Sequence, residues 1–150
     1  MDPSDFPHES TGVIQFDPGI GTRHFEPWWA LLACDPGIVD YYSWLLLRHG
    51  IALHRGSHWG PHVCFIRGQE PPDKAAWGRA SGAIPFRYSN RVRWDNGRHA
   101  WLDVWSPELA AVRESLGFPA GKTTFHLTLG RLVFPKDSTK TADPDGLLVL

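Results

Sequence analysis

The pattern of apolar and polar positions predicts two helices, one in each half of the chain. Each follows a capping residue and a proline at the first helical position, Asp35-Pro36 and Ser106-Pro107. Gly50 and Gly117 mark the two helix ends. The apolar residues that recur at helical spacing are Ile38, Tyr41, Tyr42, Leu45 and Leu46 in the first helix and Leu109, Val112 and Leu116 in the second.

Apolar runs on both sides of each helix predict strands. We expect strands over residues 28–34, 51–54, 62–67, 84–94, 100–105 and 125–132, and a helical turn over 74–79. Asp95-Asn96-Gly97 predicts a tight hairpin. Both halves thus share the order strand, capped helix, glycine stop, loop and strand, which we interpret as a divergent internal duplication.

The two ends of the chain differ from the part between them. Residues 1–10 are expected to form a flexible tail, and residues 135–150 a polar C-terminal tail whose apolar end, 147–150, either docks as a strand or stays loose. Residues 11–134 contain no linker or low-complexity run. The sequence therefore predicts one α+β domain over 11–134, long enough to bury a core.

Composition and charge exclude several classes of protein. Hydrophobic residues make up 42% and charged residues 21%, which is typical of a globular chain. The net charge of −1 gives no whole-molecule attraction to nucleic acid or to an anionic membrane. No apolar run approaches the length of a membrane span, and the polar start is unlike a signal peptide.

Cys34 and Cys64 form no CxxC motif, so we expect reduced thiols and a cytoplasmic location. We place Trp28-Trp29 and Tyr41-Tyr42 mostly in the core.

A four-residue phrase occurs twice, each time on the predicted strand that follows a helix. It reads His62-Val63-Cys64-Phe65 in the first half and His126-Leu127-Thr128-Leu129 in the second. Alternation along a strand puts the histidine and the small polar side chain on one face and the two apolar side chains on the other. Two histidines displayed across a cleft can act as a general acid and a general base.

These two motifs resemble the signature of the 2H phosphoesterase superfamily, which is a pair of His-x-Thr/Ser-x motifs on facing strands. Residues 59–68 also look like the RNA-repair-like branch found in phages and bacteria, and phage enzymes that destroy cyclic-oligonucleotide immune signals are similar in layout. The resemblance implies a two-lobed, pseudo-twofold domain with antiparallel sheets around a central cleft and helices outside. It also implies a metal-independent phosphodiesterase, without a cofactor, in the cytoplasm of a bacterium or of a phage-infected host cell.

The resemblance assigns roles to the motif residues. His62 and His126 would be the catalytic acid and base, in an order that the sequence does not fix. Thr128 and Cys64 would hydrogen-bond the phosphate oxygens, although a thiol is a poorer donor than the usual hydroxyl. The expected substrate is a cyclic oligonucleotide, a 2′,3′-cyclic phosphate or a 2′-5′ linkage at an RNA end. We expect no long duplex partner, no membrane partner and a monomer.

Four further side chains are candidates for substrate contact. Arg67 and Arg131 each lie five residues after a motif histidine. Strict alternation points them away from the histidine face, which they reach only from a strand end or a bulge. His24 follows the glycine-containing segment 19–22 in a predicted loop, and Trp59 is expected at the rim of the cleft.

Two other functions fit the same region. A binding module would sequester a cyclic nucleotide or an RNA end in the same cleft without turnover, with tryptophans stacked on the bases. A zinc protein is the other alternative, because His54, His58 and His62 are spaced by four residues. Cys64 adds a soft ligand, but the glycines and the proline in this stretch argue against a helix that would align the histidines.

Overall fold

The computed structural model describes residues 3–56, 59–135 and 146–149. The elements in chain order are η1 (Pro3–Asp5), β1 (His8–Phe16), β2 (Trp29–Cys34), α1 (Pro36–Arg48), β3 (Ala52–His54), β4 (His62–Arg67), η2 (Lys74–Ala76), β5 (Ala83–Trp94), β6 (His99–Trp105), α2 (Pro107–Ser115), β7 (Thr124–Val133) and β8 (Gly146–Val149). Within these residues, no helix has the length and apolar character needed to cross a membrane.

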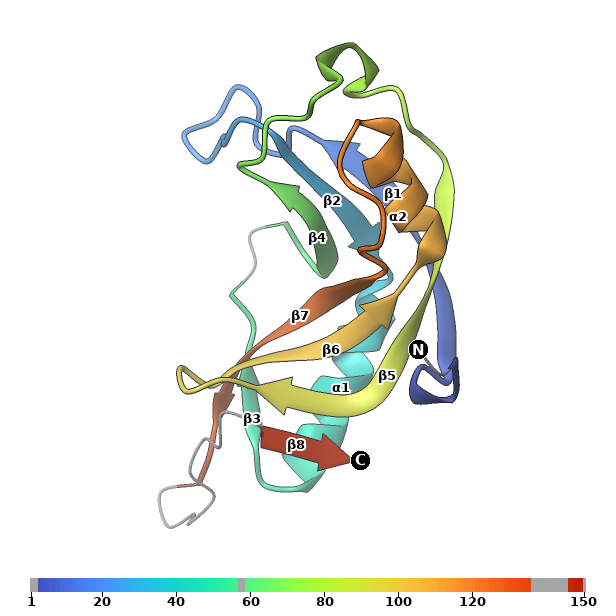
Figure 1. The fold of residues 1–150 in the computed structure, drawn as a ribbon. Helices are drawn as coiled ribbons and strands as arrows, with labels where there is room; N and C mark the ends of the chain where they lie inside the picture. Colours follow the sequence, from blue (N-terminus) through green and yellow to red (C-terminus); the bar gives the residue numbers. More distant parts are fainter. Residues whose placement is uncertain (1–2, 57–58, 136–145, 150) are drawn as a thin grey trace.

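The eight strands of the described chain form one antiparallel sheet, and six of them close into a barrel (Figure 1). The order around the barrel is β1-β2-β4-β7-β6-β5, and the pairing of β1 with β5 closes it. β3 pairs with β7 and β8 pairs with β5. The α+β class is therefore confirmed, whereas the closed barrel is a feature that the sequence pattern did not predict.

The barrel consists of two halves with the same order of elements. One half is β1-β2-α1-β4 and the other is β5-β6-α2-β7, and in each half the three strands are neighbours. The halves meet at two seams, β4–β7 and β1–β5. β1 is the counterpart of β5, so the repeated order extends further than the sequence pattern indicated. This arrangement supports the interpretation of an internal duplication.

Both helices begin as predicted. The Asp35 carboxylate accepts a hydrogen bond from the Gly37 N–H at 2.8 Å, and the Ser106 hydroxyl accepts one from the Leu109 N–H at 3.0 Å. The core residues of the helices are Ile38, Val39, Tyr42 and Leu46 from α1 and Leu109 and Val112 from α2, with Leu116 at the C-cap of α2. They share one core with buried strand residues such as Val63 and Leu127, so each helix packs against the face of the sheet that carries these residues.

Two expectations about the N-terminal end and the core are corrected, and the alternative that the C-terminal end docks as a strand is confirmed. The prediction of a flexible tail is wrong for residues 8–10, which belong to β1. Gly12 is the only buried residue of this strand, so the sequence has no alternating apolar pattern here that would predict a strand. Residues 146–149 form β8, while 136–145 lie outside the described residues. Tyr41 is 53% exposed, because adjacent helical side chains point in different directions and Tyr42 occupies the core.

Candidate functional site

β4 and β7 meet antiparallel at one seam of the barrel, where Val63 pairs with Leu127. Both residues are fully buried. Because side chains alternate along a strand, the motif residues on either side of them face away from the core that contains the helices. These residues are His62, Cys64, His126 and Thr128. The alternation predicted for both motifs is therefore confirmed.

The register brings the two motifs together on one face of this seam, the face opposite Val63 and Leu127. With Val63 opposite Leu127, His62 lies opposite Thr128 and Cys64 lies opposite His126. The two histidines are diagonal neighbours, a relationship that in antiparallel sheets corresponds to a separation of about 7–8 Å. A phosphate group fits between side chains at that spacing.

β4 contains a bulge immediately after its motif. Cys64 and Ile66 pair with the consecutive residues 31 and 30 of β2, so Phe65 is an extra residue. Phe65 and Ile66 are both buried, which confirms that alternation is broken here. One extra residue shifts the alternation by one position, and Arg67 returns to the face of Cys64.

β7 contains a bulge at the equivalent position. Thr128 and Gly130 pair with residues 101 and 100 of β6, so Leu129 is extra. Gly130 has a φ of +142°, and a side chain there would clash with the backbone of β3. Arg131 consequently returns to the face of Thr128. The strict alternation that pointed both arginines away from the histidines is thus wrong, for the same reason in both halves.

Besides a hollow of about 330 Å³ beside His126, Asp103 and Arg93, two hollows lie along this face and meet at Thr128. The larger, of about 480 Å³, is lined by His62, Thr128, Arg67 and Arg131, together with His54, Arg55, His99 and neighbouring residues. The smaller, of about 270 Å³, is lined by Cys64, His126, Thr128, Lys122, Thr124 and Phe125. The histidines therefore line adjoining hollows rather than one cleft, and both hollows contain cationic side chains.

His126 has a carboxylate and an indole as neighbours. Its ring is stacked on Trp101 with centroids 5.0 Å apart, and its Nε2 lies 3.8 Å from Asp103 Oδ1. Asp103 also accepts from Trp101 Nε1 at 3.1 Å and pairs with Arg93 at 3.0 Å. Partial burial lowers the pKa of His126; the Asp103 charge opposes this shift, and Lys122 and Arg93 add to it.

His62 is held differently. Its Nδ1 lies 2.7 Å from the carbonyl oxygen of Gly60. A carbonyl oxygen only accepts, so Nδ1 donates and Nε2 is the acceptor nitrogen of the neutral ring. The residue that faces His62 across β2 is Ala33, whereas Asp103 occupies the equivalent place beside His126. The two halves thus have different histidine environments.

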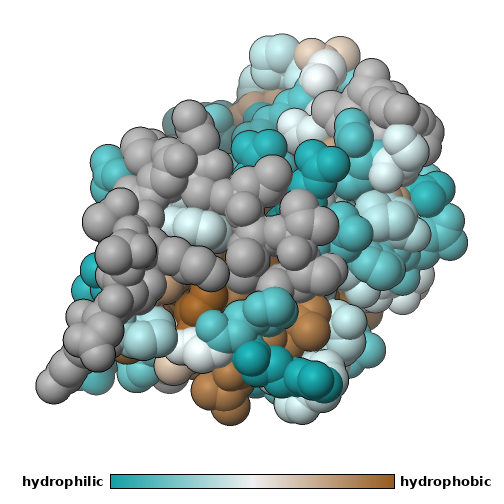
Figure 2. Space-filling model, turned by 90° about the horizontal axis from the view of Figure 1, so that it is seen from below, coloured by the Kyte–Doolittle hydropathy of each residue, from teal (hydrophilic) through white to brown (hydrophobic). Residues whose placement is uncertain are grey.

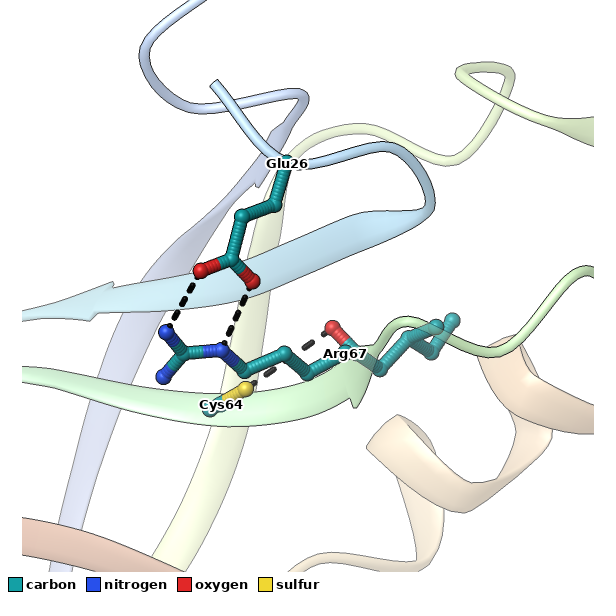
Figure 3. A network of polar contacts seen from close by, with 4 residues as sticks. Glu26, Cys64 and Arg67 are labelled. Atoms are coloured by element: carbon teal, nitrogen blue, oxygen red, sulfur yellow. Dashed lines mark hydrogen bonds and ion pairs between the residues drawn. The ribbon is translucent and has the colours of Figure 1, made fainter. Parts of the chain in front are cut away.

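Arg67 runs back along β4 over Cys64 and meets Glu26, a residue of the loop before β2 (Figure 3). The Glu26 carboxylate accepts two hydrogen bonds from its guanidinium, at 3.0 and 2.9 Å, and these bonds lower the pKa of Glu26. The guanidinium also lies 4.9 Å from the ring centre of Trp29. Burial raises the pKa of Cys64, whose sulfur lies 3.7 Å from the Ile66 carbonyl oxygen. The thiol therefore stays protonated at neutral pH.

Trp59 contacts the loop between β1 and β2, which also carries His24. Trp59 packs edge-on against Trp29, with centroids 5.8 Å apart. A side chain at Gly19 would come within 2.9 Å of the Trp59 ring, so the loop between β1 and β2 lies against Trp59. His24 is exposed on that loop, and its N–H donates to the Thr22 hydroxyl.

The zinc hypothesis is not supported by a ligand cluster in the described chain. Within residues 3–56, 59–135 and 146–149, no three or more His, Cys, Asp or Glu side chains are grouped to hold a metal ion. His58 lies outside the described residues.

Sequence reasoning missed three residues of this face, Asp103, Trp101 and Glu26. Trp101 and Asp103 alternate on a strand that was predicted, but their contact with the second motif depends on which strands pair. Glu26 lies in a loop with no motif around it.

Comparisons of the chain with protein-family models, with curated proteins and with solved structures found no match. Any function therefore has to be argued from the side chains of this surface.

Proposed function

We propose that this chain is a phosphodiesterase that acts on a nucleotide phosphodiester, with His62 and His126 as its general acid–base pair. The observation that carries the proposal is the shared register of the two motifs on adjoining strands, each followed by an arginine on the same face. Cleavage of a phosphodiester needs a proton acceptor, a proton donor and groups that stabilise charge on the non-bridging oxygens. This face offers all three kinds of group within one strand pair.

His126 suits the role of base. Its lowered pKa keeps the ring neutral at neutral pH, and Asp103 beside Nε2 favours the tautomer with a proton there, which leaves Nδ1 to accept. Water gives a proton to Nδ1 while its oxygen attacks phosphorus. The bond from phosphorus to the leaving oxygen breaks, and that oxygen takes a proton from Nε2 of protonated His62.

Four other side chains would hold the phosphate. Thr128 lies opposite His62 and two residues from His126, so its hydroxyl can donate to an oxygen between them. Arg131 has no ion-pair partner in the described part of the chain and lines the larger hollow. Arg67 and Cys64 approach from the other side of the seam.

The substrate we propose is a small nucleotide or an RNA end: a cyclic oligonucleotide, a 2′,3′-cyclic phosphate or a 2′-5′ linkage. The chain's net charge is −1, yet cationic side chains gather around a hollow of about 480 Å³, a volume typical of sites for small ligands. A local cationic hollow suits a compact phosphate-bearing ligand rather than a long duplex.

We also propose that the barrel is a two-lobed domain of the 2H phosphoesterase type, with β1-β2-α1-β4 and β5-β6-α2-β7 as its lobes. Support comes from the common order of elements and from the bulges, which both lie opposite an alanine of the neighbouring strand, Ala30 or Ala100. A pseudo-twofold axis through the two seams relates the lobes.

The proposal is tested by incubating the protein in EDTA with these three substrate classes and separating the products by chromatography. We expect turnover of at least one substrate, with losses of about 100-fold or more in His62→Ala and in His126→Ala. His49→Ala, which changes an exposed histidine at the end of α1, serves as the matched control. Undiminished turnover in the double variant would exclude the histidine mechanism.

A sequestering module is the second candidate, and Cys64 is the observation that favours it. A thiol replaces the hydroxyl expected in that motif, and the neighbouring Arg67 is already paired with Glu26. Calorimetry that detects binding of a substrate which chromatography finds intact would support this candidate over catalysis.

A further inference from the structure

α1 has an apolar face on each side. Its inner face is buried, but Tyr41, Trp44 and Leu47 on the outer face are 53%, 52% and 64% exposed. Helices that pack on one side ordinarily present polar residues to the solvent. Three large apolar side chains exposed together on a surface helix are typical of interaction sites.

The equivalent helix of the other half has no such face. The exposed residues of α2 after its first position are Glu108, Ala111, Glu114 and Ser115. Since both helices connect the second and third strands of their halves, the fold itself does not require an apolar outer face. The face on α1 is therefore specific to that helix.

The apolar face lies on the lower side of the molecule. α1 occupies that side in Figure 1, behind β5 and β6. Figure 2 shows the molecule from this side, with a group of hydrophobic side chains among hydrophilic ones; on its scale leucine counts as hydrophobic, whereas tyrosine and tryptophan do not. The histidine seam belongs to β4 and β7, whereas this face belongs to α1, whose first turn also lines the larger hollow.

This face is self-complementary about Trp44. Asp40 and Arg48 lie four residues before and after it, and Tyr41 and Leu47 lie three before and after it. When two copies of α1 pack antiparallel about a twofold axis at Trp44, Asp40 of each copy faces Arg48 of the other, and Tyr41 faces Leu47. Arg48 already lies over the Trp44 ring, 5.1 Å from its centre.

In place of the monomer expected from the sequence, we propose that this face binds a second copy of the chain through an antiparallel pair of α1 helices. The apolar residues are buried at the centre, and the two Asp40–Arg48 pairs set the direction at the rim. Asp40 also pairs with Arg55, a residue that lines the larger hollow, so the interface borders the candidate site. The proposal does not depend on catalysis.

Sedimentation equilibrium over a wide range of protein concentrations tests it. We expect a monomer–dimer equilibrium whose dissociation constant rises at least tenfold in Trp44→Glu. Ile20→Ser, which alters an apolar residue of similar exposure on the loop before β2, is the control and leaves the equilibrium unchanged. A chain that is monomeric at every concentration, or a dimer that persists in Trp44→Glu, overturns the proposal.

Charge reversal tests the antiparallel direction. Arg48→Asp alone places two acidic pairs across the interface and weakens the dimer, and Asp40→Arg alone places two basic pairs there. The double reversal restores opposite charges and the dimer. Thermal denaturation of each variant verifies that the fold is intact. Failure of the double reversal to recover dimerisation in folded protein contradicts the antiparallel pairing.

Discussion

His126 faces Asp103 across the β6–β7 pair, with Nε2 3.8 Å from Oδ1. His62 occupies the same place in the other half but faces Ala33. Two nearly equivalent positions thus give their histidines different electrostatic surroundings. This asymmetry is the physical basis for assigning the base role to one histidine and the acid role to the other.

The His126–Asp103 contact predicts a pH effect. His126 must be neutral to accept a proton, so activity falls as the pH decreases through its pKa, which lies below the usual value for histidine. Asp103→Asn removes the charge that raises this pKa, and the acid limb of the pH–rate profile shifts to lower pH. The maximal rate also falls about tenfold, because the tautomer is no longer fixed. An acid limb that moves upward would contradict the assignment.

The ion pair of Glu26 with Arg67 predicts opposite effects of two variants. Glu26→Gln frees the guanidinium for phosphate and lowers the KM, while Arg67→Ala raises the KM several-fold. The melting temperature changes little in either case, because ion pairs this exposed stabilise a fold weakly. Steady-state kinetics measures both. Equal KM values for the wild type and Arg67→Ala would show that Arg67 does not touch the substrate.

Cys64 predicts a gain of function on restoring a hydroxyl. Cys64→Thr supplies a better hydrogen-bond donor at that position and is expected to increase kcat, whereas Cys64→Ala is expected to decrease it.

The raised pKa also predicts slow alkylation of the Cys64 thiol at neutral pH and faster alkylation as the pH increases. Iodoacetamide labelling followed by mass spectrometry measures this rate. Rapid labelling at neutral pH would contradict the buried, protonated thiol.

The β4 bulge predicts a positioning role for Arg113 of α2. This buried side chain donates to the carbonyl oxygen of Phe65, the extra residue of the bulge, at 2.5 Å. Arg113→Met leaves that carbonyl unpaired and is expected to cost about 1–3 kcal/mol in urea denaturation. It also raises the KM through displacement of Arg67. A loss of stability with an unchanged KM would restrict Arg113 to a structural role.

The β7 bulge predicts that position 130 requires glycine. Gly130→Ala forces a side chain into a φ of +142° and against the β3 backbone, so we expect a loss of about 1–3 kcal/mol or more. Gly121→Ala is the matched control, because it has a φ of +108° but open space around it. Denaturant unfolding should rank Gly130→Ala as the more damaging change. The reverse order would argue against the tight bulge.

Local signals predicted the helices and the motif strands well. The caps at Asp35 and Ser106 and the alternation around Val63 and Leu127 depend only on neighbours in the sequence, and the structure confirms them. β1 was missed because its residues are mostly polar and it is specified by pairing with β2 and β5.

The face of the sheet on which Arg67 and Arg131 lie could not be predicted either, because it also depends on how the strands pair. A bulge arises from how two strands pair, and alternation within one strand does not reveal it. Gly130 is the single local signal, because glycine inside a strand often marks a bulge. Asp103 and Glu26 join the site through contacts between segments far apart in the sequence, which no local pattern encodes.

The most direct test of the central claim compares initial rates of phosphodiester cleavage in the wild type, His62→Ala, His126→Ala and the double variant, on the substrate that is cleaved fastest. When an acid and a base act in the same step, removal of either one abolishes most of the rate enhancement that the pair provides. Each single variant should therefore be nearly as slow as the double variant. Single variants that keep the wild-type rate, or losses that simply multiply in the double variant, would contradict the paired mechanism.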